Sequence, residues 1–203
     1  MTKSVKIPKA TITRLSLYYR QLELLEFDGY RMASSEKLAF LCQVNPAQVR
    51  KDLGYFGEFG IRGVGYDVIE LQAEINKILA VNRDWNLCIV GIGNLGSAIM
   101  QHHYLSERGF KCVAVFDNDP NKIGQTTPIG LKIRDVRELS RTTDELNIEI
   151  GVITTLSSAA QGVADLFLKA GIHAIMNFSP GMVRVPKYCV VENIDFTIKL
   201  DTL

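Results

Sequence analysis

The first eighty residues carry the hydrophobic spacing of amphipathic helices, in which apolar side chains recur three or four positions apart. Residues 8–27 are predicted to form one helix, whose apolar face consists of Ile12, Leu15, Tyr19, Leu22 and Leu25. Asp28 and Gly29 end this helix, and Ser34 or Ser35 can cap a second one. The buried side of the second helix is predicted to hold Leu38, Leu41 and Cys42.

A third helix is predicted after a turn of only two residues. Asn45 supplies an N-cap, Pro46 suits the first turn, and Gln48 is spaced as a capping-box partner, so the helix should reach about Tyr55. Its inward positions are then Val44, Val49 and Leu53. The side chains left to face solvent or a DNA groove are Gln48, Arg50, Lys51 and Tyr55.

Glycine punctuates the next segment, at positions 54, 57, 60, 63 and 65, between aromatic and aliphatic side chains. This pattern predicts a β-ribbon with Arg62 near its tip. Three helices with a tight turn between the second and third, followed by a ribbon, are the order of a winged helix-turn-helix. Asp67 with Glu70 then caps a fourth helix, whose apolar stripe is Val68, Leu71, Ile75, Ile78 and Leu79.

Beyond Trp85 the pattern changes to short apolar runs that alternate with helical segments. Buried strands are predicted at residues 87–90, 112–116, 148–154 and 174–178, and crossover helices at 95–107 and 157–170. This alternation indicates a doubly wound parallel α/β sheet of the Rossmann type. We therefore expect an N-terminal winged-helix domain over residues 1–82, a Rossmann domain over 83–191, and a C-terminal helix over 192–203.

Composition narrows the class of protein. A hydrophobic content of 47% is ample for packed cores. The apolar runs fall far short of the ~20 residues that span a bilayer, and no signal-peptide pattern follows the first lysines, so we expect a cytoplasmic protein without a membrane partner. The four cysteines are scattered without Cys-x-x-Cys spacing, which predicts reduced core thiols and no metal site.

The net charge of +1 conceals an uneven distribution, since residues 1–20 contain basic side chains and no acidic ones. These basic residues are Lys3, Lys6, Lys9, Arg14 and Arg20. Such a run can face DNA phosphates or form an ordinary solvated helix face. Outward-facing Arg50 and Lys51, which can donate to guanine, and Arg62, placed as a minor-groove probe, favour DNA.

A Gly-x-Gly-x-x-Gly string comes directly after the apolar run 87–90 and opens a predicted helix. Gly91 permits the tight turn, Gly93 lets backbone amides approach a pyrophosphate, and Gly96 lets the helix pack closely on the strand. The helix N-terminus then faces the anion. The predicted dinucleotide contacts are Gly91, Ile92, Gly93, Asn94, Leu95 and Gly96.

Asp117 ends the second apolar strand, about 20 residues after Gly96, where a carboxylate binds a ribose 2′-hydroxyl. Its charge would repel a 2′-phosphate, which favours NAD(H) over NADP(H). An ordinary strand-ending aspartate is the alternative interpretation. FAD and CoA also remain open on the same fold.

A dehydrogenase needs a proton-transfer group and an anchor for its substrate, and the sequence shows neither. His102 and His103 lie in the first predicted Rossmann helix, and His173 begins a strand without an acidic neighbour in sequence. We therefore expect no enzyme, with the cofactor acting as a signal. Two other classes stay open, namely a small NAD-dependent oxidoreductase and a nucleotide-binding regulatory subunit that contacts protein instead of DNA.

At these residues the chain closely resembles the Rex family of redox-sensing transcriptional repressors. The two most specific strings are Gln-Val-Arg-Lys-Asp-Leu at 48–53 and Gly-Val-Gly-Tyr at 63–66. The match continues at residues 7–8, 13–15, 19–20, 44–47, 55–60, 91–96, 116–120, 177–178 and 191–196.

The resemblance implies a homodimer that binds a palindromic double-stranded operator through two recognition helices. It implies that NADH, in competition with NAD⁺, releases the DNA. It also implies a terminal helix, around residues 193–203, that is exchanged between subunits and brings Phe196 near the partner's nicotinamide. By matching position, Asp195 reaches Arg20 of the partner subunit in the released state.

Two departures from the family pattern stand out. Relatives commonly carry a tyrosine where this chain reads Gln101-His102-His103-Tyr104, which changes the expected nicotinamide contact. The sequence also stops at Leu203, sooner than in many relatives, so the exchanged helix is expected to be short.

Overall fold

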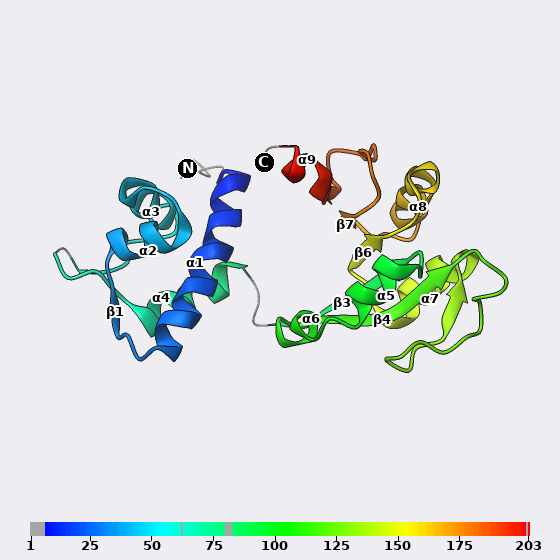
Figure 1. Cartoon of the computed structure of the whole chain (residues 1–203), viewed down its shortest axis with the longest axis horizontal. Coiled ribbons are helices and arrows are strands. Elements are labelled where there is room, and N and C mark those ends of the chain that lie inside the picture. Colours follow the sequence, from blue (N-terminus) through cyan, green and yellow to red (C-terminus); the bar gives the residue numbers. More distant parts are fainter. Residues whose placement is uncertain (1–6, 62, 80–82, 202) are drawn as a thin grey trace, which may run out of the picture. The chain divides into compact units, whose positions relative to one another are not determined.

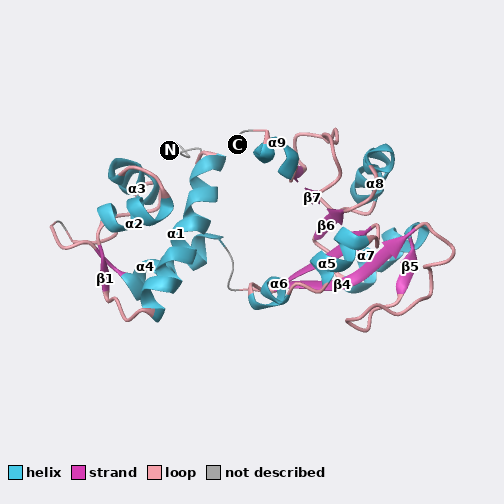
Figure 2. Cartoon of the chain, viewed as in Figure 1, coloured by secondary structure: helices cyan, strands magenta, loops and turns pink. Residues whose placement is uncertain are grey.

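The computed structural model describes residues 7–61, 63–79, 83–201 and 203. The chain divides into two compact units, Met1–Asn82 and Arg83–Leu203. Figure 1 follows the sequence through both units, and Figure 2 distinguishes the helical first unit from the strand-rich second. In the part of the chain that is described, no helix is long and apolar enough to cross a membrane.

The described residues of the first unit form four helices and a small antiparallel sheet. The helices are α1 (Lys9–Phe27), α2 (Ser35–Cys42), α3 (Pro46–Leu53) and α4 (Val68–Leu79). Strand β1 (Met32–Ala33) pairs with β2 (Tyr66–Asp67). Fully buried side chains from all four helices form one core, among them Leu15, Leu22, Leu38, Val49, Val68 and Ile75.

The buried face of α1 differs from the predicted one. Ile12 is 37% exposed, and Tyr18 rather than Tyr19 is fully buried. The observed inward positions are Thr11, Leu15, Tyr18, Leu22 and Leu25. Leu15, Leu22 and Leu25 are therefore confirmed. The prediction was wrong at two positions, where Thr11 and Tyr18 are buried in place of Ile12 and Tyr19, because the polar Thr11 was not counted as a core residue.

The caps of α2 and α3 explain where these helices begin. The Ser34 hydroxyl accepts from the Lys37 amide at 3.1 Å, and the Asn45 side chain accepts from the Gln48 amide at 2.7 Å. Both N-caps are as predicted, but the Gln48 side chain bonds within α3 instead of closing a capping box. On α2 the buried residues are Ser35, Leu38 and Ala39, so the predicted Leu38 is confirmed, while the predicted Leu41 and Cys42 are half-buried. The third helix also ends two residues before Tyr55.

The glycine-rich segment after α3 does not form the predicted ribbon of its own. Among its described residues, the strand pairing within this segment is a single antiparallel bridge between Ile61 and Gly65. The following strand β2 pairs instead with β1, which precedes α2. A Cβ at Gly65 would lie 2.6 Å from the Ala33 carbonyl oxygen, so the close approach of these two segments requires glycine. Arg62, predicted at the tip, lies outside the described residues.

The second unit contains a six-stranded parallel sheet in the order β5-β4-β3-β6-β7-β8. The strands are β3 (Trp85–Val90), β4 (Phe110–Asp117), β5 (Ile133–Asp135), β6 (Ile150–Ile153), β7 (Ala174–Asn177) and β8 (Val190–Asn193). From β3 the strands are added toward one edge as far as β5, and from β6 they are added toward the other edge. This reversal of strand order between β3 and β6 is the Rossmann arrangement. The doubly wound parallel sheet is therefore confirmed.

Helices cover both faces of this sheet. α7 (Leu139–Leu146) and α8 (Ser157–Lys169) contribute to one buried cluster, and α5 (Asn94–Met100) contributes to the other. The remaining helices are α6 (His103–Glu107), the 3-10 turn η1 (Val136–Glu138) and α9 (Phe196–Leu200). Gly151 on β6 brings α8 close, because a Cβ there would lie 2.5 Å from the Phe167 ring.

The second unit differs from the expected one in three respects. The helix predicted at 95–107 is two helices separated at Gln101–His102, so His102 precedes α6 instead of lying inside a helix. The sheet gains β5 and the helix α7, neither of which was predicted. Strand β8 also runs across the expected boundary at residue 191, and the terminal helix begins only at Phe196.

Candidate functional site

The glycine loop after β3 lies at the point where strand order reverses, which is where open α/β sheets bind ligands. Gly91 adopts φ +100°, and its amide donates to the Phe116 carbonyl at 2.8 Å. A Cβ at Gly91 would lie 2.8 Å from Thr155 Cγ2, and one at Gly96 would lie 2.3 Å from the Gly91 carbonyl oxygen. A Cβ at Gly93 would meet nothing within 4 Å. Two of the three glycines are therefore required by packing, and the third borders open space.

A groove of about 950 Å³ runs beside this loop. Its walls come from the carboxyl ends of β3, β4 and β6 and from the first turns of α8. The lining includes Gly91, Gly93, Asp117, Asn118, Lys122, Thr154, Thr155, Leu156 and Ser158. This volume is large enough for an extended cofactor, since ligand pockets commonly measure about 300–1,000 Å³.

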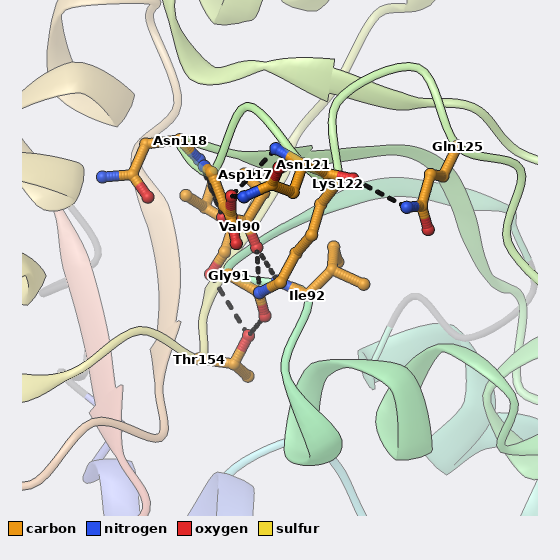
Figure 3. Close-up of polar contacts among 10 residues, drawn as sticks. Val90, Gly91, Ile92, Asp117, Asn118, Asn121, Lys122, Gln125 and Thr154 are labelled. Carbon is orange, nitrogen blue, oxygen red and sulfur yellow. Dashed lines mark hydrogen bonds and ion pairs between the residues drawn. The ribbon is translucent and has the colours of Figure 1, made fainter.

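Asp117 occupies one wall of the groove and is only 6% exposed. Its Oδ2 accepts from the Ile92 amide at 2.9 Å and from Lys122 Nζ at 3.1 Å. Its Oδ1 accepts from the amides of Asn118 and Asp119 at 2.9 and 3.0 Å (Figure 3). The carboxylate therefore fixes the glycine loop to the end of β4.

The surroundings of Asp117 favour its charged form. Burial alone would raise its pKa, but the amides of Asp119 and Ile92 and the Lys122 ammonium outweigh burial and hold the pKa below the usual value. Lys122 was not among the predicted site residues. Its Nζ places a cation beside the carboxylate that was expected to repel a 2′-phosphate.

Thr154 holds the loop from the opposite strand. Its hydroxyl lies 2.7 Å from the Gly91 carbonyl oxygen and 3.1 Å from that of Val90, so it donates to this pair of acceptors (Figure 3). Asn94 and Leu95 begin α5, directly after the loop, and Leu95 is exposed. The predicted glycine-loop residues are thus brought together with Asp117 at one edge of the sheet.

A buried carboxylate also organises the first unit. Asp52 on α3 is 0% exposed, and four side chains donate to it. On α1 these are Thr11 Oγ1 at 2.9 Å, Tyr18 OH at 2.9 Å, and Arg14 through Nε at 2.5 Å and Nη2 at 2.8 Å. On α3 itself, Gln48 Nε2 donates at 2.9 Å. Asp52 therefore connects the candidate recognition helix to α1.

The same contacts set the protonation states in this cluster. Burial would raise the pKa of Asp52, but the hydrogen bonds from Arg14, Tyr18, Gln48 and Thr11 outweigh it and lower the pKa. Burial, with a further contribution from the Asp52 carboxylate, raises the pKa of the Tyr18 hydroxyl. Asp52 is therefore an anion and Tyr18 a neutral donor at neutral pH.

The candidate DNA-contacting residues differ in how far they are already engaged. Arg14 and Gln48 bond to Asp52, and Arg50 Nη1 donates to Ser35 Oγ at 2.7 Å and lies 3.4 Å from Glu36 Oε1. Lys51 is exposed on α3 and Tyr55 is half-buried just after it.

The candidate switch residues lie in separate units, Arg20 exposed on α1 and Asp195 just before α9. The Asp195 Oδ1 accepts from the Thr197 amide at 3.0 Å and from the Thr197 hydroxyl at 2.6 Å, so it caps α9. Hydrogen bonds from the Thr197 hydroxyl and amide lower the pKa of Asp195. Phe196 is 68% exposed.

Several residues of these sites were missed by sequence reasoning. Asp52 carried a signal, because it lies three positions after Val49 and so shares the inward face of the third helix. Thr154 carried none, since it bonds to a loop more than 60 positions away in the sequence. Lys122 lies only five positions after Asp117, but no motif marks a lysine in that turn as a partner of the carboxylate.

Family models match both units of the chain. A "Putative DNA-binding protein N-terminus" model matches residues 6–54, and a "CoA binding domain" model matches residues 82–181. The redox-sensing transcriptional repressor Rex of Syntrophobacter fumaroxidans is 53% identical over 201 residues, which cover 99% of this chain and 96% of that protein. The Rex 1 protein of Thermotoga maritima is 45% identical over 198 residues, covering 98% and 94%.

Solved structures agree over nearly the whole length. RSP, a Rex-family repressor, in complex with NAD⁺ and operator DNA matches with a TM-score of 0.91 and 34% identity, over 98% of this chain and 91% of that one. RSP in complex with NADH matches with a TM-score of 0.88 and 33% identity, over 98% and 93%. The chain therefore belongs to the Rex family of redox-sensing transcriptional repressors.

Proposed function

We propose that this protein is a transcriptional repressor that binds operator DNA through its first unit and releases it when NADH binds to the second. The observation that carries the proposal is the match over 98% of the chain to RSP, which has been solved both with NAD⁺ and operator DNA and with NADH. Family membership at 53% identity supports the same conclusion.

The residues of the groove fit a dinucleotide. Gly93 borders open space beside a loop that Gly91 and Gly96 keep tightly packed, so a pyrophosphate can approach the backbone there. We assign cofactor contacts to Gly91, Ile92, Gly93, Asn94, Leu95, Gly96 and Asp117, with Phe196 serving the partner subunit's site. The nicotinamide supplies the redox signal, because NAD⁺ carries one positive charge on the ring that NADH lacks.

The DNA-reading surface in this proposal is the outward side of α3. Lys51 is exposed there, and Gln48, Arg50 and Tyr55 lie on or next to the same helix. We assign these four residues, together with Arg14 and Arg62, to the operator contact. Two such helices in a homodimer would read a palindromic site.

Coupling between the units is assigned to Arg20 and Asp195. In the NADH-bound dimer, Asp195 would pair with Arg20 of the partner subunit. This pair would hold the two recognition helices at a separation that does not match the two half-sites of the operator. A ligand shifts such an equilibrium only by its differential affinity for the two states, and a preference of ~100-fold corresponds to about 2.7 kcal/mol.

The proposal is tested by selecting DNA from a library of random genomic fragments with the full-length protein, with and without NADH. We expect the selection without NADH to enrich palindromic fragments. In a gel shift of a selected fragment, 1 mM NADH should abolish binding, and an equal concentration of NAD⁺ should leave it in place. Equal effects of the two cofactors, or no enriched palindrome, would refute the repressor function. Oxidation of NADH by a carbonyl substrate would instead indicate an oxidoreductase.

A further inference from the structure

A fully buried asparagine lies where β7 ends, beside the dinucleotide groove. Asn177 is 0% exposed, and its side-chain amide makes three hydrogen bonds. Its Nδ2 donates to the Gly181 carbonyl at 3.0 Å and to Asn193 Oδ1 at 2.9 Å, and its Oδ1 accepts from the Ser179 amide at 3.0 Å. An amide with both ends engaged fixes the positions of all three partners.

On one side this asparagine connects to the groove. Ser179, which Asn177 holds through its amide, is buried, and its hydroxyl donates to the Thr155 carbonyl at 2.5 Å. Thr155 lines the groove and packs against Gly91. Within the described residues the buried Thr155 hydroxyl has no hydrogen-bond partner. Such a group costs free energy, so this edge of the groove is poised to rearrange when a ligand adds or moves polar atoms.

On the other side Asn177 connects to the C-terminal segment. Asn193 is its direct neighbour in the β7–β8 register and is the last residue of β8. The Ile194 amide donates to the Asn177 carbonyl at 2.8 Å. The chain then continues through Asp195 into α9, so Asn177 determines where this helix leaves the sheet.

We propose that Asn177 is a positioning residue that links the dinucleotide groove to α9 through the series Thr155, Ser179, Asn177 and Asn193. Displacement of Thr155 by the cofactor moves Ser179, and the buried amide transmits that movement to the start of the C-terminal segment. This inference rests on the proposed function, since it assigns the route by which NADH binding changes operator affinity.

The test uses two variants, which remove the first and the last side-chain hydrogen bonds of the series, and one matched control. Ser179→Ala removes the bond to Thr155, and Asn193→Ala removes the side-chain bond to Asn177 at an exposed position. The control is Gln161→Ala. Gln161 on α8 bonds to the amide and carbonyl of Arg184, in the loop between β7 and β8, and within the described residues it makes no hydrogen bond to the series.

For each full-length protein, the NADH dissociation constant is measured by calorimetry and operator affinity by fluorescence anisotropy, with and without saturating NADH. In both variants we expect NADH affinity within about twofold of wild type. The ratio of operator affinity without NADH to operator affinity with NADH should fall at least about fivefold, as expected for residues that couple the two sites. The control should keep the wild-type ratio.

A wild-type ratio in either variant would overturn the inference, as would an equal reduction in Gln161→Ala or a loss of NADH affinity that accounts for the reduced ratio. These results leave the proposed function intact, because wild-type protein still responds. If the wild-type protein itself shows no effect of NADH on operator binding, the proposed function fails, and the inference fails with it.

Discussion

Each unit keeps one aspartate out of solvent, and the two carboxylates are stabilised in different ways. In the described part of the first unit, Asp52 is bonded only to side chains, from Thr11, Arg14, Tyr18 and Gln48. Asp117 in the second is bonded mainly to backbone amides, with Lys122 as its one side-chain partner within the described residues. In both cases hydrogen bonds to the anion outweigh the effect of burial and lower the pKa.

The difference indicates what each carboxylate is for. Side-chain donors on α1 lie up to 41 positions from Asp52, so that cluster fixes one helix against another. Backbone donors to Asp117 belong to the glycine loop and to the turn after β4, so that cluster fixes the shape of a ligand-binding loop. Loss of the first should therefore appear as instability, and loss of the second as weaker cofactor binding.

The largest effect is expected for Asp52→Ala. It leaves Arg14, Tyr18 and Gln48 without their common acceptor, and loss of one member of a buried charged pair costs about 3–5 kcal/mol. The free energy of unfolding of the first unit, followed by circular dichroism in urea, should fall by that amount. NADH affinity is the internal control and should be unchanged. A loss below about 1 kcal/mol would show that the cluster is not a structural link.

Asp117→Ala is expected to weaken NADH binding by about 10–100-fold, because unsatisfied buried donors cost about 1–3 kcal/mol. The free Lys122 ammonium would also improve the relative affinity for NADPH. Calorimetric titration with both cofactors measures the two effects. The double variant Asp117→Ala/Lys122→Ala should lose the gain toward NADPH. An unchanged cofactor preference in Asp117→Ala would contradict this role for Lys122.

A smaller change is expected for Lys51→Ala, which should weaken operator binding by about 1–2 kcal/mol. The slope of the logarithm of the binding constant against the logarithm of salt concentration should become less steep by about 1. NADH affinity should not change, since Lys51 lies in the first unit. Lys77→Ala is the matched control, because Lys77 is an exposed lysine of the same unit on α4. Equal losses in the two variants would indicate a general charge effect instead of a contact from α3.

The smallest effect concerns pH. Because both aspartates have a lowered pKa in the folded state, each contributes stability that is present above the unfolded pKa of 3.8 and is lost as pH falls through the folded value. The free energy of unfolding should therefore decline below about pH 4. Asp52→Asn should make this decline shallower for the first unit. Identical acid profiles for the two proteins would argue against an ionised Asp52.

The predictable parts of the molecule were those specified by neighbouring residues. Asn45 and Asp67 cap their helices as the sequence predicts, and the glycines after β3 form the expected tight loop. The site around Asp117 was predicted in position, but its partner Lys122 was not.

The errors lie where contacts between distant segments decide the structure. Asp52 pairs with Arg14 across 38 positions, which no local pattern records. The break at Gln101–His102 has no glycine or proline to mark it. The sequence around β5 is too short and polar to stand out as a buried strand.

The pairing of β3 with β6 also affects the order in which the two units fold during synthesis. Leu87 pairs with Ile150, so a long intervening segment must be synthesised before this central pair of strands can form. Closing such a loop is slow compared with the local contacts of a helical unit. The glycine loop also cannot form its hydrogen bond to the Thr154 hydroxyl until residue 154 has been synthesised. During synthesis the first unit can therefore fold while the chain is still unable to hold a nucleotide, and a nascent chain would meet DNA before it could respond to the redox state of the cell.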